Sequence, residues 1–302
     1  IPDESIMKNF LNDSVEHNYI LSIGNAVNAI KNPPKPFHTS RLLQTASNQL
    51  HMSPKETMSL CQQLYQNGFI TYMRTENDSY SKDFLSKMQS YISDKFKSDE
   101  YIGNLKIIEN SNSDNPHEAI RVTQLDMKTL PNCENTRMVT LYKLIWRTTI
   151  ESCMSPATYK QTTLQVSAPI EYSYKTVTEC PMFLGWKIVQ SKTDITVEQN
   201  NYSSNLLYFK SLMEGKNAII CKNIDADIHV TTNHCYYTEA SLVSKLESLG
   251  IGRPSTYSTI VETIKDRGYV KKMDTDGYKV TCNNYKLINN NIDTYYKRRA
   301  GL

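Results

Sequence analysis

Long hydrophobic runs are missing from this 302-residue sequence: no window approaches the roughly 18 consecutive apolar residues that a membrane-spanning helix needs. The first 20 residues also lack the basic segment followed by an apolar stretch that marks a secretory signal peptide. None of the seven cysteines forms a C-x-x-C pair, which argues against a disulfide framework and a zinc ribbon. We therefore expect a soluble, intracellular protein with reduced cysteines, no metal site in this chain and no membrane partner.

A strong excess of one charge is also missing, because the net charge is only +3. The surplus is nevertheless local: residues 236–302 hold 11 Lys and Arg against 7 Asp and Glu. A content of 22% charged and 39% hydrophobic residues is typical of a folded chain, and the length allows two or three domains. The chain opens with Ile1 and Pro2 rather than Met, so we expect a processed chain or a piece of a longer one.

The middle of the chain, residues 36–159, carries helical periodicity and is predicted to form a helical domain. Its sharpest signal is Ser53-Pro54-Lys55-Glu56, a capping box with proline at the first helical position, followed by a stop at Asn67-Gly68. A short strand is predicted over Phe69–Arg74, and the polar stretch 98–116 is predicted to be a loop.

The flanking segments favour β structure. Residues 160–235 contain short β-prone runs, and residues 1–35 contain a similar run, Tyr19–Ile23. We expect a discontinuous β-rich domain, 1–35 with 160–235, into which the helical domain is inserted. Asp225-Ala226-Asp227 is interpreted as a turn, as is Asp274-Thr275-Asp276.

The last segment, residues 236–302, predicts a partial winged-helix-like domain. A helix from Thr238 is followed by a glycine-rich turn, and Ser255 is predicted to cap a second helix. A hairpin is expected to pair Tyr269–Lys272 with Tyr278–Val280. Because winged helices bind either nucleic acids or proteins, both functions stay open on pattern alone.

Tyr72 and Arg74 form the first candidate site. On a strand their side chains would project to the same face, near enough for both to reach one phosphate. A neighbouring guanidinium favours the phenolate and stabilises negative charge on a phosphorane, so the pair would suit nucleophilic attack on a phosphodiester. The alternative is that Tyr72 is one of 20 tyrosines in an ordinary strand setting.

Two further groups of residues could bind phosphate. In a helix, His117 and Arg121 would share one face and place an imidazole beside a fixed cation. At the start of the second C-terminal helix, Arg253 would join free backbone N–H groups and hydroxyls in binding an anion. The hydroxyls are those of Ser255 and Thr256, and Arg267 lies near the far end of the same helix.

Four groups of residues, in order along the chain, resemble the motifs of type IA DNA topoisomerases, closest to the bacterial topoisomerase I branch. They are PFHTS at 36–40, QQLYQNGFITYMRT at 62–75, HEAIR at 117–121 and a block between 237 and 270 that contains YTEASL, RPSTY and DRGYV. Glu76 stands where the bacterial branch usually carries Asp, and Val122 stands where it usually carries Pro.

The resemblance implies an α+β, multidomain fold shaped as a toroidal arch. It also implies an isomerase that cleaves one DNA strand through a 5′-phosphotyrosine on Tyr72, reseals the strand without ATP and so relaxes negatively supercoiled DNA. By the same resemblance, Arg74 and His117 assist cleavage. The residues implied to bind the strand, chiefly single-stranded DNA, are Arg121, Arg253, Ser255, Thr256 and Arg267.

The family's N-terminal Toprim domain, which holds Mg²⁺ on acidic residues, has no counterpart in the sequence. We therefore expect a monomeric, DNA-associated segment, in the cytoplasm, nucleoid or a viral equivalent. We expect it to be inactive alone and to work with a Toprim domain in the same longer chain or a separate one. The alternatives are a truncated homologue that binds single-stranded DNA without cutting it, or one half of a split enzyme. A tyrosine recombinase is disfavoured, because its nucleophile usually lies near the C-terminus.

Overall fold

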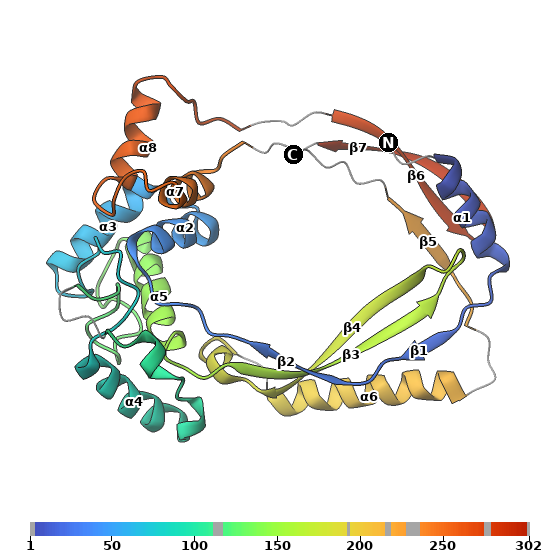
Figure 1. The fold of residues 1–302 in the computed structure, drawn as a ribbon, viewed down its shortest axis with the longest axis horizontal. Helices are drawn as coiled ribbons and strands as arrows, with labels where there is room; N and C mark the ends of the chain where they lie inside the picture. The colour runs from blue at the N-terminus through green and yellow to red at the C-terminus, as the bar shows by residue number, and fades with distance from the viewer. Residues whose placement is uncertain are drawn as a thin grey trace.

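The structure is a computed structural model that describes residues 4–110, 117–191, 194–214, 219–227, 236–274 and 279–300. It mixes α and β structure, as the sequence predicts. The described elements lie around a central opening, with most helices on one side and two antiparallel sheets along the rest (Figure 1). None of the helices in these ranges is long and apolar enough to cross a membrane.

Four helices form the largest block: α2 (Thr39–Leu50), α3 (Pro54–Gln66), α4 (Lys82–Phe96) and α5 (Thr136–Glu151). Two 3₁₀ turns, η1 (Asp99–Tyr101) and η2 (Leu105–Ile108), occupy part of the segment predicted as a loop. One hydrophobic core joins the four helices, and burial of each large side chain in it contributes about 1.5–3 kcal/mol. The block therefore forms a rigid base for the segments that run between its helices.

Helix α3 begins as its sequence predicts. The Ser53 hydroxyl accepts a hydrogen bond from the Glu56 N–H at 3.1 Å, and Pro54 occupies the first turn, where its missing N–H costs nothing. In the predicted capping box the Glu56 carboxylate would accept a second hydrogen bond from the Ser53 N–H. It binds Arg137 of α5 at 2.6 Å instead. The helix stops where Gly68 adopts a φ of 74°, which favours glycine.

The first sheet combines strands from both sides of the helical block. Its central strand β3 (Ala157–Ser167) pairs with β1 (Leu21–Ile23), β2 (Val27–Lys31) and β4 (Ser173–Phe183), all antiparallel. Such pairing is what an inserted helical segment requires. Since β3 already begins at Ala157, the domain boundaries at 35/36 and 159/160 stay predictions.

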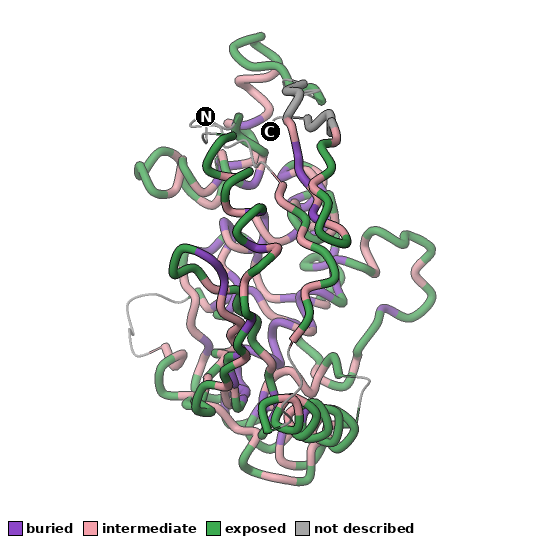
Figure 2. The backbone as a smooth tube through the Cα atoms, turned by 90° about the vertical axis from the view of Figure 1, so that its right-hand side faces the viewer, coloured by how far each residue is buried: buried purple, intermediate pink, exposed green. Residues whose placement is uncertain are grey.

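Helix α6 (Ile195–Glu214) packs along β4 (Figure 1), where the sequence predicts only β-prone runs; that expectation is wrong for these residues. Ile195, Tyr202, Leu206 and Phe209 recur at helical spacing and form one apolar face, on which Tyr202 is buried and the other three are half-buried. Tyr202 shares a 2.7 Å hydrogen bond with Thr162 of β3. Figure 2 shows the helix at the foot of the molecule, exposed over most of its length. A short 3₁₀ segment, η3 (Gly185–Val189), joins β4 to α6.

The second sheet consists of β5 (Asn223–Ala226), β6 (Lys279–Ile288) and β7 (Asn291–Ala300). Helix α1 (Glu4–Glu16) packs on it, and Leu11, Tyr285 and Leu287 form a small core. The Glu4 carboxylate accepts a hydrogen bond from the Tyr285 hydroxyl at 2.9 Å.

This second sheet contradicts the hairpin expected between Tyr269–Lys272 and Tyr278–Val280. The residues from Tyr269 to Asp274 form no strand, and β6 pairs with β5 and β7 instead. The β6–β7 connection runs through Asn289 and Asn290, whose φ values of 48° and 63° fit a tight type I′ hairpin turn. The turn expected over Asp274-Thr275-Asp276 lies largely outside the described residues.

Helices α7 (Glu239–Ser248) and α8 (Tyr257–Asp266) pack against the helical block, α7 on α2 and α8 on α3. The Thr238 and Ser241 side chains form a complete capping box at the start of α7. The cap of α8 is Thr256, not Ser255 as predicted, and its side chain caps no helical N–H. The reason is a tight turn in which the Thr256 hydroxyl accepts the Arg253 N–H at 2.8 Å.

Candidate functional site

The segment from Phe69 to Arg74 is extended, but it is not the strand that the sequence predicts. Its only bridge joins Ile70 to Val122, and the Thr71 N–H donates to the Arg121 carbonyl at 2.9 Å. Side chains nevertheless alternate, since Met73 is fully buried while Tyr72 is partly exposed and Arg74 is exposed. The alternation supports the expected placement of the Tyr72 and Arg74 side chains on one face.

Tyr72 lies in an aromatic environment that leaves its hydroxyl available. Its ring centroid lies 5.3 Å from that of Tyr65 in an edge-to-face contact and 5.7 Å from that of His117. No residue in the described part of the chain hydrogen-bonds the Tyr72 hydroxyl, and the side chain is not sealed in the core. The structure thus brings together Tyr72 and His117, which lie 45 residues apart in the sequence.

Thr39, at the first turn of α2, holds the tyrosine segment from its buried side. The Thr39 hydroxyl lies 2.8 Å from the Met73 carbonyl as donor and 2.9 Å from the Thr75 N–H as acceptor. In addition, the Thr39 N–H donates to the Thr75 carbonyl at 3.0 Å. These bonds fix the backbone on both sides of Arg74. Thr39 is a positioning residue that the sequence did not single out, although it lies in the 36–40 motif.

Asn77 is a second positioning residue that the sequence did not reveal. Its side-chain N–H donates to the His117 carbonyl at 2.6 Å, and its amide oxygen accepts the Ser79 N–H at 2.9 Å. Asn77 therefore ties the exposed His117 to the segment that carries Tyr72. The signal that could have found it is its place two residues after Thr75, at the end of the tyrosine motif.

Residues 117–121 do not form the helix in which His117 and Arg121 would share one face. The segment is extended, with bridges from Ile120 to Phe37 and from Val122 to Ile70, because it fills the space between two other extended segments. The Arg121 guanidinium binds both carboxylate oxygens of Glu118, at 2.6 and 3.0 Å. It also stacks on the Phe84 ring at 3.9 Å and is only 14% exposed. The structure therefore gives Arg121 a structural role, and its contact with DNA stays a prediction.

Arg253 lies beside the tyrosine segment although it comes from the turn between α7 and α8. Its Nε lies 3.8 Å from the carboxylate of Glu76, and both side chains are mostly exposed, at 68% and 63%. Its guanidinium also donates to the Gly252 carbonyl at 2.8 Å. The structure thus brings Arg253 near the tyrosine segment, with Ser255 and Thr256 in the same turn, while Arg267 is exposed at the opposite end of α8.

The tyrosine-bearing block also meets α7 at Glu247. The Ser40 hydroxyl donates to the Glu247 carboxylate at 2.7 Å, and Nδ1 of His38 lies 3.5 Å from the same carboxylate. Burial lowers the pKa of His38, with the nearby Arg41 acting in the same direction. With His38 neutral at neutral pH, the polar contact with Glu247 rests on the Ser40 hydrogen bond rather than on an ion pair.

No group of three or more His, Cys, Asp or Glu side chains suited to a metal ion occurs among the residues that the structure describes. The Asp225-Ala226-Asp227 segment, interpreted as a turn, instead places Asp225 in β5. Its carboxylate lies 3.5 Å from the Lys286 ammonium, and that of Asp227 accepts the Tyr295 hydroxyl at 3.0 Å. These occupied carboxylates do not fit a Mg²⁺ ion.

Comparison with known proteins gives consistent matches. A family model described as DNA topoisomerase matches residues 3–296. The prokaryotic-type DNA topoisomerase 1 of Acanthamoeba polyphaga mimivirus is 36% identical over 271 residues, covering 86% of this chain and 32% of that protein. DNA topoisomerase 1 of Haemophilus influenzae is 37% identical over 244 residues, covering 79% of this chain and 27% of that protein.

A solved structure matches as well. Full-length topoisomerase I from Thermotoga maritima aligns with a TM-score of 0.63 and 27% sequence identity, over 90% of this chain and 44% of that one. The chain thus spans about a quarter to a third of the length of the curated relatives that it matches.

Proposed function

The chain belongs to the DNA topoisomerase family, and we propose that it supplies the nucleophilic tyrosine of a type IA enzyme. In this proposal the Tyr72 oxygen attacks a backbone phosphorus of one DNA strand. The new P–O bond to tyrosine forms as the bond from phosphorus to the 3′ oxygen breaks, and the 3′ hydroxyl leaves with a proton. The reverse attack by that hydroxyl reseals the strand, so no ATP is needed.

The observation that carries the proposal is what surrounds Tyr72 and its hydroxyl. It is free of hydrogen bonds to the described residues, lies beside His117 and is two residues from the exposed Arg74. The buried bonds of Thr39 hold the segment, so the tyrosine needs little reorganisation to meet a phosphate. Arg74 makes no ion pair with any residue in the described ranges, and its charge is available to a phosphodiester.

Arg253 extends the same surface toward a bound strand. Because its only acidic neighbour in the described ranges is Glu76, at 3.8 Å and largely exposed, a phosphate can replace that weak pair at little cost. We propose that Arg253 and Arg267 bind the strand through its phosphates. The Thr256 hydroxyl is already bonded within the turn, so its role in the proposal is to hold Arg253 in place.

A Toprim domain with Mg²⁺ belongs to the proposal but not to the described part of this chain, whose acidic residues do not fit the ion. A second candidate is a chain that binds single-stranded DNA but cuts it only with a separate Toprim partner. The two are separated by incubating the protein with Mg²⁺ and an oligonucleotide labelled at its 3′ end.

The 3′ label lies on the part of the strand that would remain bound to tyrosine after cleavage. A labelled protein adduct from the complete protein alone supports the first candidate. An adduct that requires an added Toprim chain supports the second. If neither mixture gives an adduct, and the protein does not relax negatively supercoiled DNA, the cleavage proposal is wrong.

A further inference from the structure

A groove of about 400 Å³ lies between α2 and α7, apart from the Tyr72 segment and Arg253. Its walls carry amides, hydroxyls, an ammonium and a phenol, and the lining includes no acidic side chain. The lining residues that matter here are Gln44, Asn48, Tyr237, Ser244 and Lys245. Such a lining is complementary to an anion with several hydrogen-bonding groups.

Three of these side chains have polar groups that are free to bind a ligand. Within the described ranges, the Asn48 amide, the Ser244 hydroxyl and the Lys245 ammonium make no side-chain hydrogen bond or ion pair. Both glutamates of α7 already have partners: Glu247 is bonded to Ser40, and Glu239 pairs with Lys265 and Lys272. A phosphate in the groove would therefore meet a free cation and free donors without an opposing carboxylate.

The mouth of the groove is aromatic. Tyr237 precedes α7 and is 62% exposed, and its neighbour Tyr236 is 83% exposed. Exposed aromatic rings beside a basic groove are the usual platform for stacking unpaired bases, a contact worth about 1–3 kcal/mol per base. The phenol and the ammonium together fit one nucleotide, with its base on the ring and its phosphate at Lys245.

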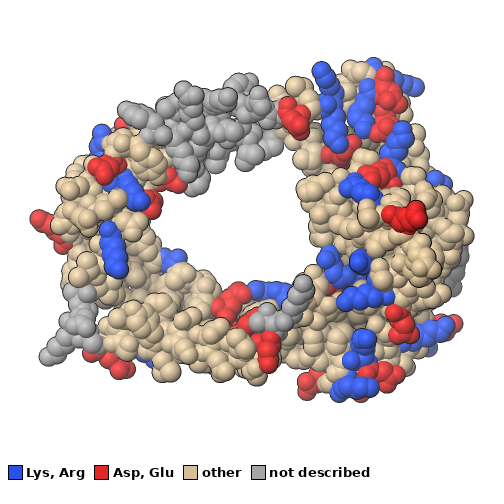
Figure 3. Space-filling model, turned by 180° about the vertical axis from the view of Figure 1, so that it is seen from behind, with Lys and Arg blue, Asp and Glu red and all other residues tan. Residues whose placement is uncertain are grey.

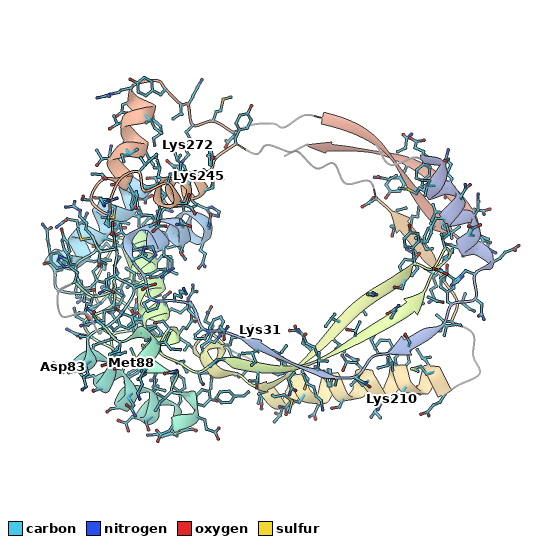
Figure 4. All side chains as sticks on the ribbon, viewed as in Figure 1. Lys31, Asp83, Met88, Lys210, Lys245 and Lys272 are labelled. Atoms are coloured by element: carbon cyan, nitrogen blue, oxygen red, sulfur yellow. The ribbon has the colours of Figure 1, made fainter. Side chains whose placement is uncertain are left out.

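The groove also lies at the rim of the central opening. Figure 4 places Lys245 and Lys272 beside the central opening, and Figure 1 shows α2 and α7 reaching its rim. Seen from behind, Lys and Arg side chains gather along the helical side of the opening (Figure 3). The Ser40–Glu247 contact links the two walls, and Thr39 links the α2 wall to the tyrosine segment.

We propose that the α2–α7 groove is a second binding site for single-stranded DNA, which takes one nucleotide through Lys245, Asn48 and Tyr237. The inference rests on the proposed function and adds a site that neither the tyrosine motif nor Arg253 provides. Because each wall comes from a different part of the chain, a nucleotide that touches both walls stabilises their contact. Strand binding here would thereby hold the tyrosine-bearing block against α7.

The test is fluorescence anisotropy of the complete protein with a labelled single-stranded oligothymidylate at several salt concentrations. We expect Lys245→Ala to weaken binding about 3- to 10-fold and to lower the salt slope by about one. Ser244→Leu should fill the groove and weaken binding without changing the slope. Lys210→Ala is the matched control, since Lys210 is an exposed lysine on α6 and Figure 4 places it away from the groove.

The outcomes separate this inference from the proposed function. If Arg253→Ala weakens binding while Lys245→Ala and Ser244→Leu behave like Lys210→Ala, the groove is not a DNA site and the proposed function stands. If the wild-type protein binds no single-stranded DNA, both proposals fail. Ultraviolet crosslinking of a 4-thiothymidine oligonucleotide gives a second readout: a crosslink to Tyr237 supports the groove, and crosslinks confined to other peptides contradict it.

Discussion

The backbone of Thr75 is hydrogen-bonded to both the side chain and the backbone of Thr39, although the two residues lie 36 positions apart. The Thr39 hydroxyl accepts the Thr75 N–H at 2.9 Å, and the Thr39 N–H donates to the Thr75 carbonyl at 3.0 Å. Both residues are buried, at 0% and 3% exposure. The first turn of α2 therefore sets the position of Tyr72 and Arg74, so the motif at 36–40 and the tyrosine motif work as one unit.

Thr39→Val tests this unit, because valine keeps the shape of threonine and loses the hydroxyl. The buried Thr75 N–H loses its acceptor, which should lower the free energy of unfolding by about 1–3 kcal/mol in urea denaturation. Thr45→Val is the matched control, since the Thr45 hydroxyl only donates back to the Arg41 carbonyl in the same helix. Equal losses for the two variants would show that Thr39 does not hold the segment.

Arg253→Ala should weaken single-stranded DNA binding and lower its salt slope by about one, because one phosphate contact is lost. Glu76→Gln should have the opposite effect on affinity, since it removes the carboxylate beside Arg253. Both residues are mostly exposed, so neither change should alter the melting temperature. Binding titrations at three or more salt concentrations measure the slope, and an unchanged slope for Arg253→Ala would remove this residue from the interface.

Arg121→Ala should act on stability instead. It removes the bidentate pair with Glu118 and the stack on Phe84, and leaves the Glu118 carboxylate partly buried. We expect a loss of about 2 kcal/mol in the free energy of unfolding, partly recovered when Glu118→Ala is added. Binding of DNA by the folded fraction should barely change. Normal stability with weakened binding would restore the DNA-contacting role that the motif implies.

Glu151 gives a prediction on pH. Burial at the end of α5 raises the pKa of its carboxyl from 4.5 to about 7, while Gln190 and Arg147 act in the opposite direction. The folded protein therefore keeps a proton that the unfolded chain releases. The stability gained from this proton is present below about pH 4.5 and is lost as the pH rises through 7.

Glu151→Gln isolates this effect, because the amide keeps an acceptor for Gln190 and cannot ionise. The variant should be more stable than the wild type at pH 8 by up to about 3 kcal/mol and equal to it near pH 4.5. Urea denaturation at the two pH values measures the difference. Parallel curves for wild type and variant would show that Glu151 does not titrate in this range.

Local signals in the sequence predicted local structure well. The Ser53 cap, Pro54 and Gly68 set the limits of α3, because each acts within one turn of its own position. Features that depend on distant partners could not be predicted in this way. The β-prone residues of β6 indicate a strand, but they do not say that it pairs with β5 and β7 rather than with Tyr269–Lys272.

The candidate site shows the same division. The tyrosine motif predicted Tyr72 and Arg74 as site residues, whereas the positions of Thr39 and Asn77 depend on partners that only the fold brings near. Arg121 was predicted to bind DNA because the sequence of the motif does not show that its guanidinium is paired with Glu118. Its pair with Glu118 forms in an extended segment, not in the helix in which Arg121 and His117 would share one face.

The most direct test of the central claim is to identify the amino acid bound to cleaved DNA. The complete protein, with Mg²⁺ and a Toprim domain supplied in the same chain or separately, is incubated with a 3′-labelled single strand, and the trapped adduct is digested for mass spectrometry. We predict a nucleotide on the peptide that contains Tyr72, joined through its 5′ phosphate, and no adduct from a Tyr72→Phe variant that still binds the strand. An adduct on another residue, or one that persists in Tyr72→Phe, would contradict the account.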